Sequence, residues 1–382
     1  MKIALVHDYI KEYGGAEKVL EALHEIFPEA PVFTAVYLPQ FLGPHKYRFE
    51  NWDIRTSYLQ HIPFKQKLIS PFRLLTGPVF KSFNFSGFDG IITSATGAYI
   101  PNNLNKKNAQ LFCYCHTPPR YLYGYATARN WTKNTWLRAG AHIANHFLRM
   151  QDFNASQNVD QYIANSNEVA GRIRKFYRRE SVVIYPPVDL LLSQTNRKDG
   201  QGVTKRQPDT RKDSAYYLAG GRLARAKHID LIIRACLDLQ KPLKIFGKSF
   251  AGYGDELQKI ANGNELIEFL GEVTEEEKRK LYLNAKAYLF ASEDEDFGIM
   301  PVESMAAGTP VIAHRSGGVQ ETVIEGKTGL FFNDLSVQSL IKAIEQFEQI
   351  KFYTKDCIVR AEKFSKERFM TEIKKLVDRK DR

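Results

Sequence analysis

Residues 292–309 read SEDEDFGIMPVESMAAGT, and they follow an apolar run that ends near Phe290. The stretch combines an acidic loop, Gly298, a proline at position 301 that can occupy the first turn of a helix, and a helix end at Gly308. A glycine before a helix lets backbone N–H groups approach a phosphate, whose charge the helix dipole favours. The stretch therefore predicts a strand–loop–helix unit of a doubly wound α/β fold with an anion site at its turn.

Two glutamates flank this turn. We predict Glu295 in the loop, facing the bound group, and Glu303 in the first helical turn, where a carboxylate can accept two hydrogen bonds from a vicinal diol such as a ribose. The structural alternative is that Glu303 only complements the helix dipole and that residues 293–296 form a solvated loop. Residues 294–296 also fit an Asp-x-Asp metal motif, but their place before a glycine and a helix favours sugar binding over metal binding.

A second segment, residues 220–230, reads GGRLARAKHID. A predicted strand ends in its glycines, and Arg222 and Lys227 then flank a turn into a helix. Two cations at such a junction suit a diphosphate and can stabilise the charge that grows on it as a leaving group. The alternative is a solvated basic turn.

Strand and helix patterns recur in both halves of the chain. A strand over Ile3–His7, a loop with Gly14 and Gly15, and a helix over residues 16–27 open the first half, and a long helix is predicted over 136–159. Continuous apolar runs are typical of buried parallel strands. The further runs span residues 90–93, 110–115, 161–164, 216–219, 243–246, 266–270, 287–290 and 311–313.

This rhythm predicts an α/β protein of two Rossmann-like, doubly wound domains that face a central cleft, residues 1–190 and 191–382. The polar stretch 196–213 is predicted as a linker between them or as a loop of the second domain. A last helix, over about residues 358–382, is expected to pack back on the first domain.

The composition is that of a soluble globular protein, with 43% hydrophobic and 25% charged residues among 382. No run approaches the ~18 apolar residues of a transmembrane helix. The four cysteines show neither metal spacing nor a disulfide pattern, so we expect reduced core thiols, which fit the cytoplasm.

The net charge of +11 is concentrated in one region: between Arg55 and Arg149 there are twelve basic residues and one acid, Asp89. Such a field attracts phosphorylated acceptors, anionic lipid or nucleic acid. The same span is rich in aromatic residues. It predicts either an ordinary solvated surface or a face that docks on an anionic membrane, and no nucleic-acid-binding motif supports the third partner.

The motifs of residues 220–230 and 292–309 together resemble glycosyltransferase family 4, the retaining group 1 transferases with a GT-B fold. The family's Glu-x7-Glu motif corresponds to Glu295 and Glu303, and its cationic pair to Arg222 and Lys227. Two features depart from the pattern: Lys227 follows Leu223 by four, and the loop 246–254 is longer than usual. Other matching stretches are residues 14–19, 116–121, 183–189, 269–271, 308–313, 317–318, 321–323 and 328–331.

The resemblance implies roles for individual residues. Arg222 and Lys227 would hold the diphosphate, Glu295 the sugar hydroxyls and Glu303 the ribose, while His116 would face the donor sugar and the acceptor. The implied catalytic residues are His116, Arg222, Lys227 and Glu295. The implied donor-binding residues are Gly14, Gly15, Phe269, Gly271, Gly298, Ile299, Met300 and Glu303.

Within the family, the chain looks most like mannosyltransferases of O-antigen and exopolysaccharide assembly. The implied reaction is retaining hexosyl transfer, with mannose from GDP-mannose as the expected donor and a glycan or a polyprenyl-diphosphate-linked acceptor. No metal cofactor and no nucleic-acid partner are expected. The expected location is the cytoplasm, peripheral on the inner face of the cytoplasmic membrane. The alternatives are a sugar-nucleotide epimerase on the same scaffold and a non-catalytic basic protein that binds membrane or nucleic acid.

Overall fold

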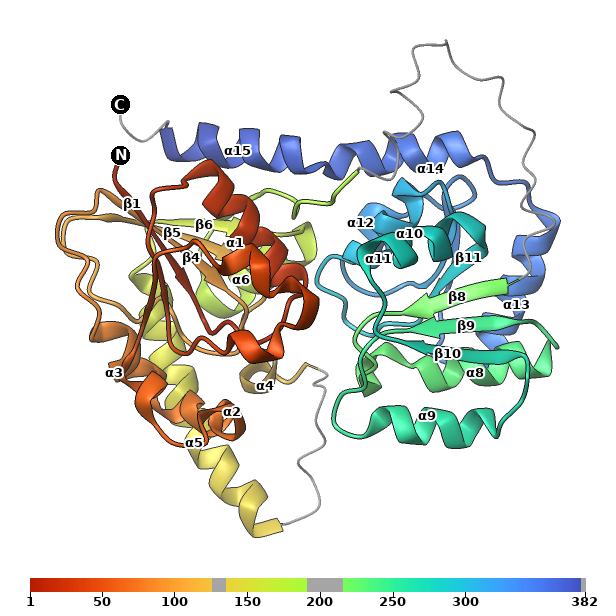
Figure 1. Cartoon of the computed structure of the whole chain (residues 1–382), viewed down its shortest axis with the longest axis horizontal. Helices are drawn as coiled ribbons and strands as arrows, with labels where there is room; N and C mark the ends of the chain where they lie inside the picture. The colour runs from red at the N-terminus through yellow and green to blue at the C-terminus, as the bar shows by residue number, and fades with distance from the viewer. Residues whose placement is uncertain (126–134, 191–215, 379–382) are drawn as a thin grey trace. The chain divides into compact units, whose positions relative to one another are not determined.

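The computed structural model describes residues 1–125, 135–190 and 216–378, which form two compact units (Figure 1). Unit 1 comprises the described residues up to Pro187 together with those from Glu367 onward, and unit 2 comprises the described residues of Val188–Lys366. The predicted linker at 196–213 lies outside the described residues, as do Arg129 and Lys133 of the basic span.

Unit 1 contains a parallel seven-stranded sheet with the order β3-β2-β1-β4-β5-β6-β7. Its strands are β1 (Ile3–His7), β2 (Val32–Thr34), β3 (Ile54–Thr56), β4 (Gly90–Ala95), β5 (Gln110–Cys115), β6 (Gln161–Ala164) and β7 (Ser181–Val183). Its helices are α1 (Gly15–Ile26), α2 (Lys65–Leu68), α3 (Thr76–Lys81), α4 (Arg120–Tyr123), α5 (Thr135–Gln157), α6 (Asn167–Tyr177) and α15 (Lys366–Asp378).

The central strands of this sheet are buried and mostly apolar, because helices and loops cover both faces. On one face, Leu5 of β1 and Phe112 of β5 pack with α1 and with Phe369 and Ile373 of α15. The ring of Phe369 lies edge-on to that of Tyr114, with 5.6 Å between the ring centroids. Helix α15 therefore completes the core of unit 1, although it follows all of unit 2 in the chain.

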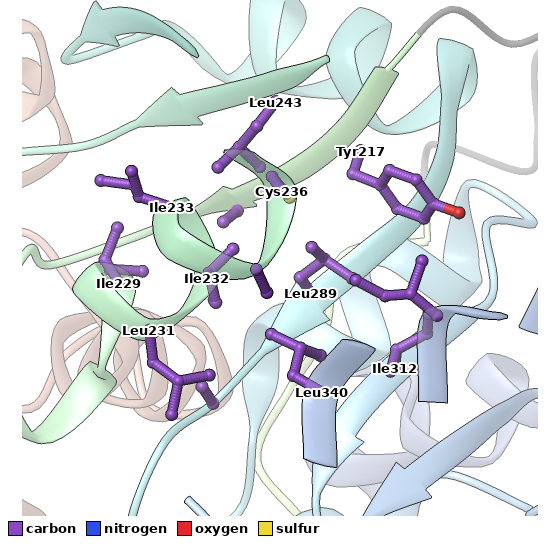
Figure 2. Packing of buried hydrophobic residues seen from close by; sticks show 14 of the residues in the cluster. Tyr217, Ile229, Leu231, Ile232, Ile233, Cys236, Leu243, Leu289, Ile312 and Leu340 are labelled. Atoms are coloured by element: carbon purple, nitrogen blue, oxygen red, sulfur yellow. The ribbon is translucent and has the colours of Figure 1, made fainter. Parts of the chain in front are cut away.

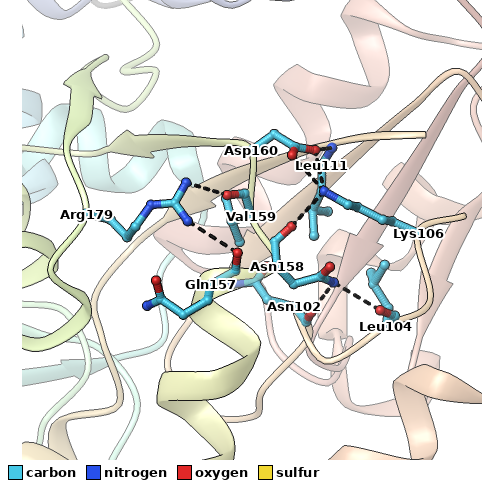
Figure 3. A network of polar contacts seen from close by, with 9 residues as sticks. All are labelled: Asn102, Leu104, Lys106, Leu111, Gln157, Asn158, Val159, Asp160 and Arg179. Carbon is cyan, nitrogen blue, oxygen red and sulfur yellow. Dashed lines mark hydrogen bonds and ion pairs between the residues drawn. The ribbon is translucent and has the colours of Figure 1, made fainter. Parts of the chain in front are cut away.

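A polar network fixes the loop before β5 to the turn between α5 and β6 (Figure 3). Lys106 Nζ donates to Asp160 Oδ1 at 2.7 Å and to the Asn158 carbonyl at 3.0 Å. The side-chain amide of Asn158 donates in turn to the carbonyls of Asn102, at 3.2 Å, and Leu104, at 3.0 Å. These bonds satisfy backbone carbonyls in connecting segments, which lie outside the hydrogen-bonded strands of the sheet.

Unit 2 contains a parallel six-stranded sheet with the order β10-β9-β8-β11-β12-β13. Its strands are β8 (Tyr216–Gly220), β9 (Leu243–Phe246), β10 (Ile267–Gly271), β11 (Ala285–Phe290), β12 (Val311–His314) and β13 (Gly329–Phe332). Its helices are α8 (Ile229–Asp238), α9 (Tyr253–Ala261), α10 (Glu275–Asn284), α11 (Ile299–Ala306), α12 (Val319–Thr322), α13 (Val337–Gln349) and α14 (Thr354–Ala361).

The core of unit 2 forms where α8 packs on the sheet (Figure 2). Ile229, Ile232, Ile233 and Cys236 recur at helical spacing and point toward the strands, so one face of α8 is buried. Leu289 of β11 lies on the same side. These contacts fix α8, and therefore the turn that leads into it from β8.

The predicted strands and the two long helices agree with the structure to within two residues at each end. The pattern missed the three-residue strands β2, β3 and β7, and also β13. The last helix begins at Lys366, not near 358, because a 3₁₀ turn at Glu362–Phe364 separates it from α14. No helix in the described part of the chain has the length and apolarity to cross a bilayer.

Candidate functional site

Two neighbouring strands of unit 2, β8 and β11, end side by side, and polar residues follow each of them. Lys227 lies in the 3₁₀ turn Arg225–Lys227 after β8, and Glu295 lies in the loop after β11. Lys227 Nζ is ion-paired with Glu295 Oε2 and donates to Ser292 Oγ at 3.1 Å. The Ser292 hydroxyl donates to the same Glu295 oxygen at 2.6 Å. The structure thus joins the predicted cation and carboxylate in one triad.

Two glycines, Gly317 and Gly318, lie directly against the backbone of the loop that carries Glu295. Gly318 N–H donates to the Glu295 carbonyl at 2.8 Å. An added Cβ at Gly317 would lie 2.1 Å from that carbonyl oxygen, and one at Gly318 would lie 2.4 Å from the Asp296 carbonyl oxygen. A side chain at Gly317 or Gly318 would collide with the backbone of the loop that carries Glu295. The absence of side chains at these two positions therefore determines where that loop lies.

The start of α11 is fixed against the end of β8. Tyr288 of β11 donates its hydroxyl to the Gly220 carbonyl at 2.9 Å and lies 3.7 Å from Met300 Sδ. Gly221, at φ +107°, leaves no room for a side chain, since a Cβ would lie 2.5 Å from the same sulfur. Gly298, at φ +91°, precedes the first residue of α11. The N–H groups that open α11 therefore lie at the edge of the sheet that also bears Lys227.

Glu303 occupies a different position from the one predicted. It is the fifth residue of α11 and so belongs to its second turn, because the helix begins already at Ile299. Its buried carboxylate lies 3.2 Å from the ammonium group of Lys278 on α10. The prediction of a first-turn carboxylate was wrong. No motif pointed to Lys278, because its contact with Glu303 joins two separate helices.

The buried residue Tyr288 is influenced by both glutamates. Burial raises the pKa of its hydroxyl well above the usual range, and the carboxylates of Glu303 and Glu295 raise it further. The phenol therefore stays protonated at neutral pH and keeps its donor role toward Gly220. The carboxylates of Glu295 and Glu303 therefore both act on the same buried hydroxyl.

The other predicted residues of unit 2 lie on several elements, and β9 separates the strand that carries Phe269 and Gly271 from β8. Arg222 is exposed, and its guanidinium lies 5.7 Å from the centre of the Phe250 ring. Phe269 and Gly271 end the edge strand β10, and Leu270 between them lines a cavity of about 460 Å³. Ile299 opens α11.

In unit 1, the predicted residues lie at the carboxyl edge of the sheet. Gly14 is the N-cap of α1, Gly15 is its first residue, and Gly14 N–H donates to Glu17 Oε2 at 2.9 Å. His116 follows β5, and its Nε2 lies 2.9 Å from Ser94 Oγ. Burial lowers the pKa of His116 to about 3, with a further contribution from the charge of His7, so the imidazole is neutral at pH 7.

None of the described residues forms a group of three or more histidine, cysteine, aspartate or glutamate side chains arranged to hold a metal. Within the Asp-x-Asp pattern, the middle residue is Glu295, which is engaged with Lys227 and Ser292.

Comparison with known proteins bears on both units. Residues 201–364 match the family model described as glycosyl transferases group 1. Among curated proteins, the alpha-1,3/1,6-mannosyltransferase ALG2 of Dictyostelium discoideum is 27% identical over 284 residues, which cover 65% of this chain and 65% of that protein. The alignment thus spans slightly less than two thirds of that relative.

Solved structures are similar over nearly the full length. Anabaena Alr3699/HepE, in complex with UDP and glucose, has a TM-score of 0.68 at 18% identity, covering 99% of both chains. Sucrose-phosphate synthase from Thermosynechococcus elongatus has a TM-score of 0.73 at 19% identity, with the same coverage. Likeness at such identities shows a shared fold, here two Rossmann-like parallel-sheet domains.

Proposed function

Since residues 201–364 match the model of group 1 glycosyl transferases and the fold is GT-B, we propose that the chain is such a transferase. In this proposal it moves a hexose, with retention, from a nucleotide-diphosphate sugar to a glycan or lipid-linked acceptor. Mannose from GDP-mannose is the donor we favour, a choice supported by the likeness to a mannosyltransferase. A nucleotide-diphosphate donor is further supported by the UDP complex of a structural neighbour.

The observation that carries this proposal is the triad of Lys227, Ser292 and Glu295 beside the start of α11. An ammonium group and free helix N–H groups at one strand edge suit a pyrophosphate, whose charge increases as the glycosidic bond breaks. When the donor binds, the diphosphate competes for Lys227 and frees the Glu295 carboxylate to accept from sugar hydroxyls. Arg222 adds a second cation, and no metal ion is required in this scheme.

Within unit 1, the neutral imidazole of His116 can hold a sugar hydroxyl by a hydrogen bond without adding a charge. Gly14 and Gly15 let the backbone approach the donor closely. The acceptor proton passes to the leaving diphosphate on the same face of the sugar, so no protein nucleophile is needed.

A nucleotide screen tests the donor. We expect GDP-mannose to raise the melting temperature more than UDP or ADP sugars do, because a ligand at a hundred times its Kd stabilises the native state by about 2.7 kcal/mol. That gain corresponds to on the order of 5 °C for a chain of this size. The Lys227→Ala variant serves as the control and should lose most of the shift. Failure of every nucleotide sugar to stabilise the protein would contradict the proposal.

Product analysis separates transfer from epimerisation. A transferase incubated with donor and no acceptor leaves the nucleotide sugar unchanged apart from slow hydrolysis. Accumulation of an epimerised nucleotide sugar under those conditions would instead support the epimerase alternative.

The acceptor is proposed to be lipid-linked, which requires contact with a membrane. Helix α5 exposes Ile143, Phe147 and Met150, each more than half exposed and spaced so that they share one helix face. Phe64, before α2, and Leu74 are likewise more than half exposed. These five residues are here called the apolar surface.

The apolar surface lies within the basic span. Gly77 of α3 faces α5, since a Cβ there would lie 2.0 Å from Gln151 Nε2. Asp89, the only acid between Arg55 and Arg149 in the sequence, accepts from Lys2 N–H just before the strands β1 and β4. Exposed apolar groups among cations fit an anionic bilayer.

Vesicle co-sedimentation tests this docking. We expect binding to vesicles that contain phosphatidylglycerol, loss of binding at high salt, and little binding to pure phosphatidylcholine. Combining Ile143→Ser with Phe147→Ser should weaken binding at least about tenfold, because each large side chain contributes roughly 1.5–3 kcal/mol on burial. The matched control is Val359→Ser, at an exposed apolar position of unit 2. Equal binding by the double variant and the control would contradict the assignment, and concentration-dependent self-association in its place would assign the surface to a second copy of the chain.

A further inference from the structure

A buried histidine at the end of β1 is not accounted for by the proposed mechanism. His7 is fully buried, and neither of its ring nitrogens has a hydrogen-bond partner. The hydroxyl of Thr34, its register partner on β2, is also buried without a partner. Leaving such groups unsatisfied costs about 1–3 kcal/mol each, so their retention at the carboxyl edge of the sheet calls for a reason beyond folding.

Glu17 connects this histidine to the glycine loop. One carboxylate oxygen, Oε2, accepts from Gly14 N–H at 2.9 Å. The other, Oε1, lies 3.6 Å from His7 Nε2, and the Glu17 side chain is only 8% exposed. The separation is slightly longer than a hydrogen bond, and contacts of this kind tighten when substrate orders a site.

His7 is also linked to His116. It is the register partner of Ser94 on the neighbouring strand β4, and Ser94 Oγ lies 2.9 Å from His116 Nε2. The charge of His7 acts on His116, lowering its pKa in addition to the effect of burial. Gly14, Glu17, His7, Ser94 and His116 therefore form a series of neighbouring residues, called here the network. It has hydrogen bonds at its two ends, Gly14–Glu17 and Ser94–His116, and His7 lies between them, 3.6 Å from Glu17 and in register with Ser94.

We propose that Glu17 and His7 are positioning residues that hold the Gly14-Gly15 loop and His116 in a fixed relation to each other. The proposal rests on the function proposed above, in which both of these features contact the donor or the acceptor. Glu17 and His7 themselves act through Gly14 and His116. The buried pair Glu17 and His7 thereby positions both the Gly14-Gly15 loop and His116, which are distant in the sequence. A displacement of Glu17 or of His7 moves both of these features.

Steady-state kinetics of Glu17→Gln provides the first test. We expect kcat to fall between about tenfold and a hundredfold, as for a misplacement of the order of 1 Å, while KM for the donor changes little. Glu17→Asp keeps the charge and should recover part of the loss. The matched control is Glu25→Gln, at an exposed glutamate of the same helix, which should keep full activity. Equal activity of the Glu17→Gln and Glu25→Gln variants would overturn the proposal.

A double-mutant cycle separates positioning from general destabilisation. If Glu17 acts through His116, then His116→Ala and Glu17→Gln should be non-additive in kcat, because the second change removes what the first has already lost. Strict additivity of the two effects would overturn the proposal.

Nuclear magnetic resonance of histidine rings tests the network without any assay of transfer. In protein labelled at its histidines, Glu17→Gln should shift the ring resonances of His7 and His116, whereas Glu25→Gln should leave both unchanged. If these shifts occur in a protein that transfers no sugar, the network stands and the proposed function fails. Unchanged His116 resonances in the Glu17→Gln protein would overturn the network itself.

Discussion

Replacing Lys227 by alanine should lower kcat/KM for sugar transfer by roughly a hundredfold to a thousandfold, the effect typical of removing one preorganised group that stabilises developing charge. Lys227 is the cation placed most directly for this role, because it is held between Ser292 and Glu295 at the end of β8. The ring of Phe290, whose centre lies 5.4 Å from Nζ, further restricts the ammonium group. Activity should be measured at saturating and limiting donor, so that the effect on kcat is separated from the effect on KM.

The control for this prediction is Lys286→Ala, which removes a partly exposed lysine of β11 whose ammonium group donates to Glu348 at 2.7 Å. Lys227→Met, which keeps the aliphatic stem, guards against an effect of lost packing. The melting temperature of both Lys227 variants should be measured beside their activity, because their ion pair with Glu295 is partly buried and its loss lowers stability as well. Activity within twofold of the original for Lys227→Met would show that the cation does not serve the leaving group.

Gly317→Ala should destabilise unit 2 by about 2–5 kcal/mol and weaken donor binding at the same time. Part of the cost comes from the backbone, since Gly317 has φ +67°, where an L-residue loses about 1–2 kcal/mol. The rest comes from the new Cβ, which would lie 2.1 Å from the carbonyl oxygen of Glu295 and must push that loop away. Urea unfolding measures the first effect, and nucleotide-sugar titration measures the second.

The matched control is Gly326→Ala. Gly326 has φ +73°, nearly the same backbone conformation, but an added Cβ there meets no atom within 4 Å. It should therefore lose only the backbone contribution of about 1–2 kcal/mol and bind donor normally. If both alanine variants bind donor equally well, Gly317 does not set the position of Glu295.

Sequence patterns predicted most of the regular fold because long apolar runs and helical periodicity leave few alternatives. The strands β2 and β3 escaped prediction because three residues carry too little pattern to distinguish from a loop. Pro301 does lie in the first turn of α11, as its third residue. The prediction for Glu303 was wrong because the helix begins at Ile299, which places this glutamate in the second turn.

The residues of the site were easier to predict from the sequence than the contacts between them. Lys227 and Glu295 could be singled out from local motifs, but their ion pair depends on β8 and β11 being neighbours in the sheet. Lys278 carried no motif at all, and its contact with Glu303 depends on how α10 packs on α11. His7 read simply as part of a buried strand, and only the structure shows that its ring lacks partners. Spacing along one chain cannot specify such contacts between separate elements.

Helix α15 has a consequence for how the chain matures during synthesis. Phe369, Ile373 and Val377 belong to the core of unit 1, yet a ribosome adds them only after every residue of unit 2 has been made. All residues of unit 2 are therefore available for folding before the core of unit 1 is complete, since that core still lacks the apolar residues of α15. A premature stop near residue 366 would spare unit 2 and leave the sheet of unit 1 with an open, aggregation-prone face.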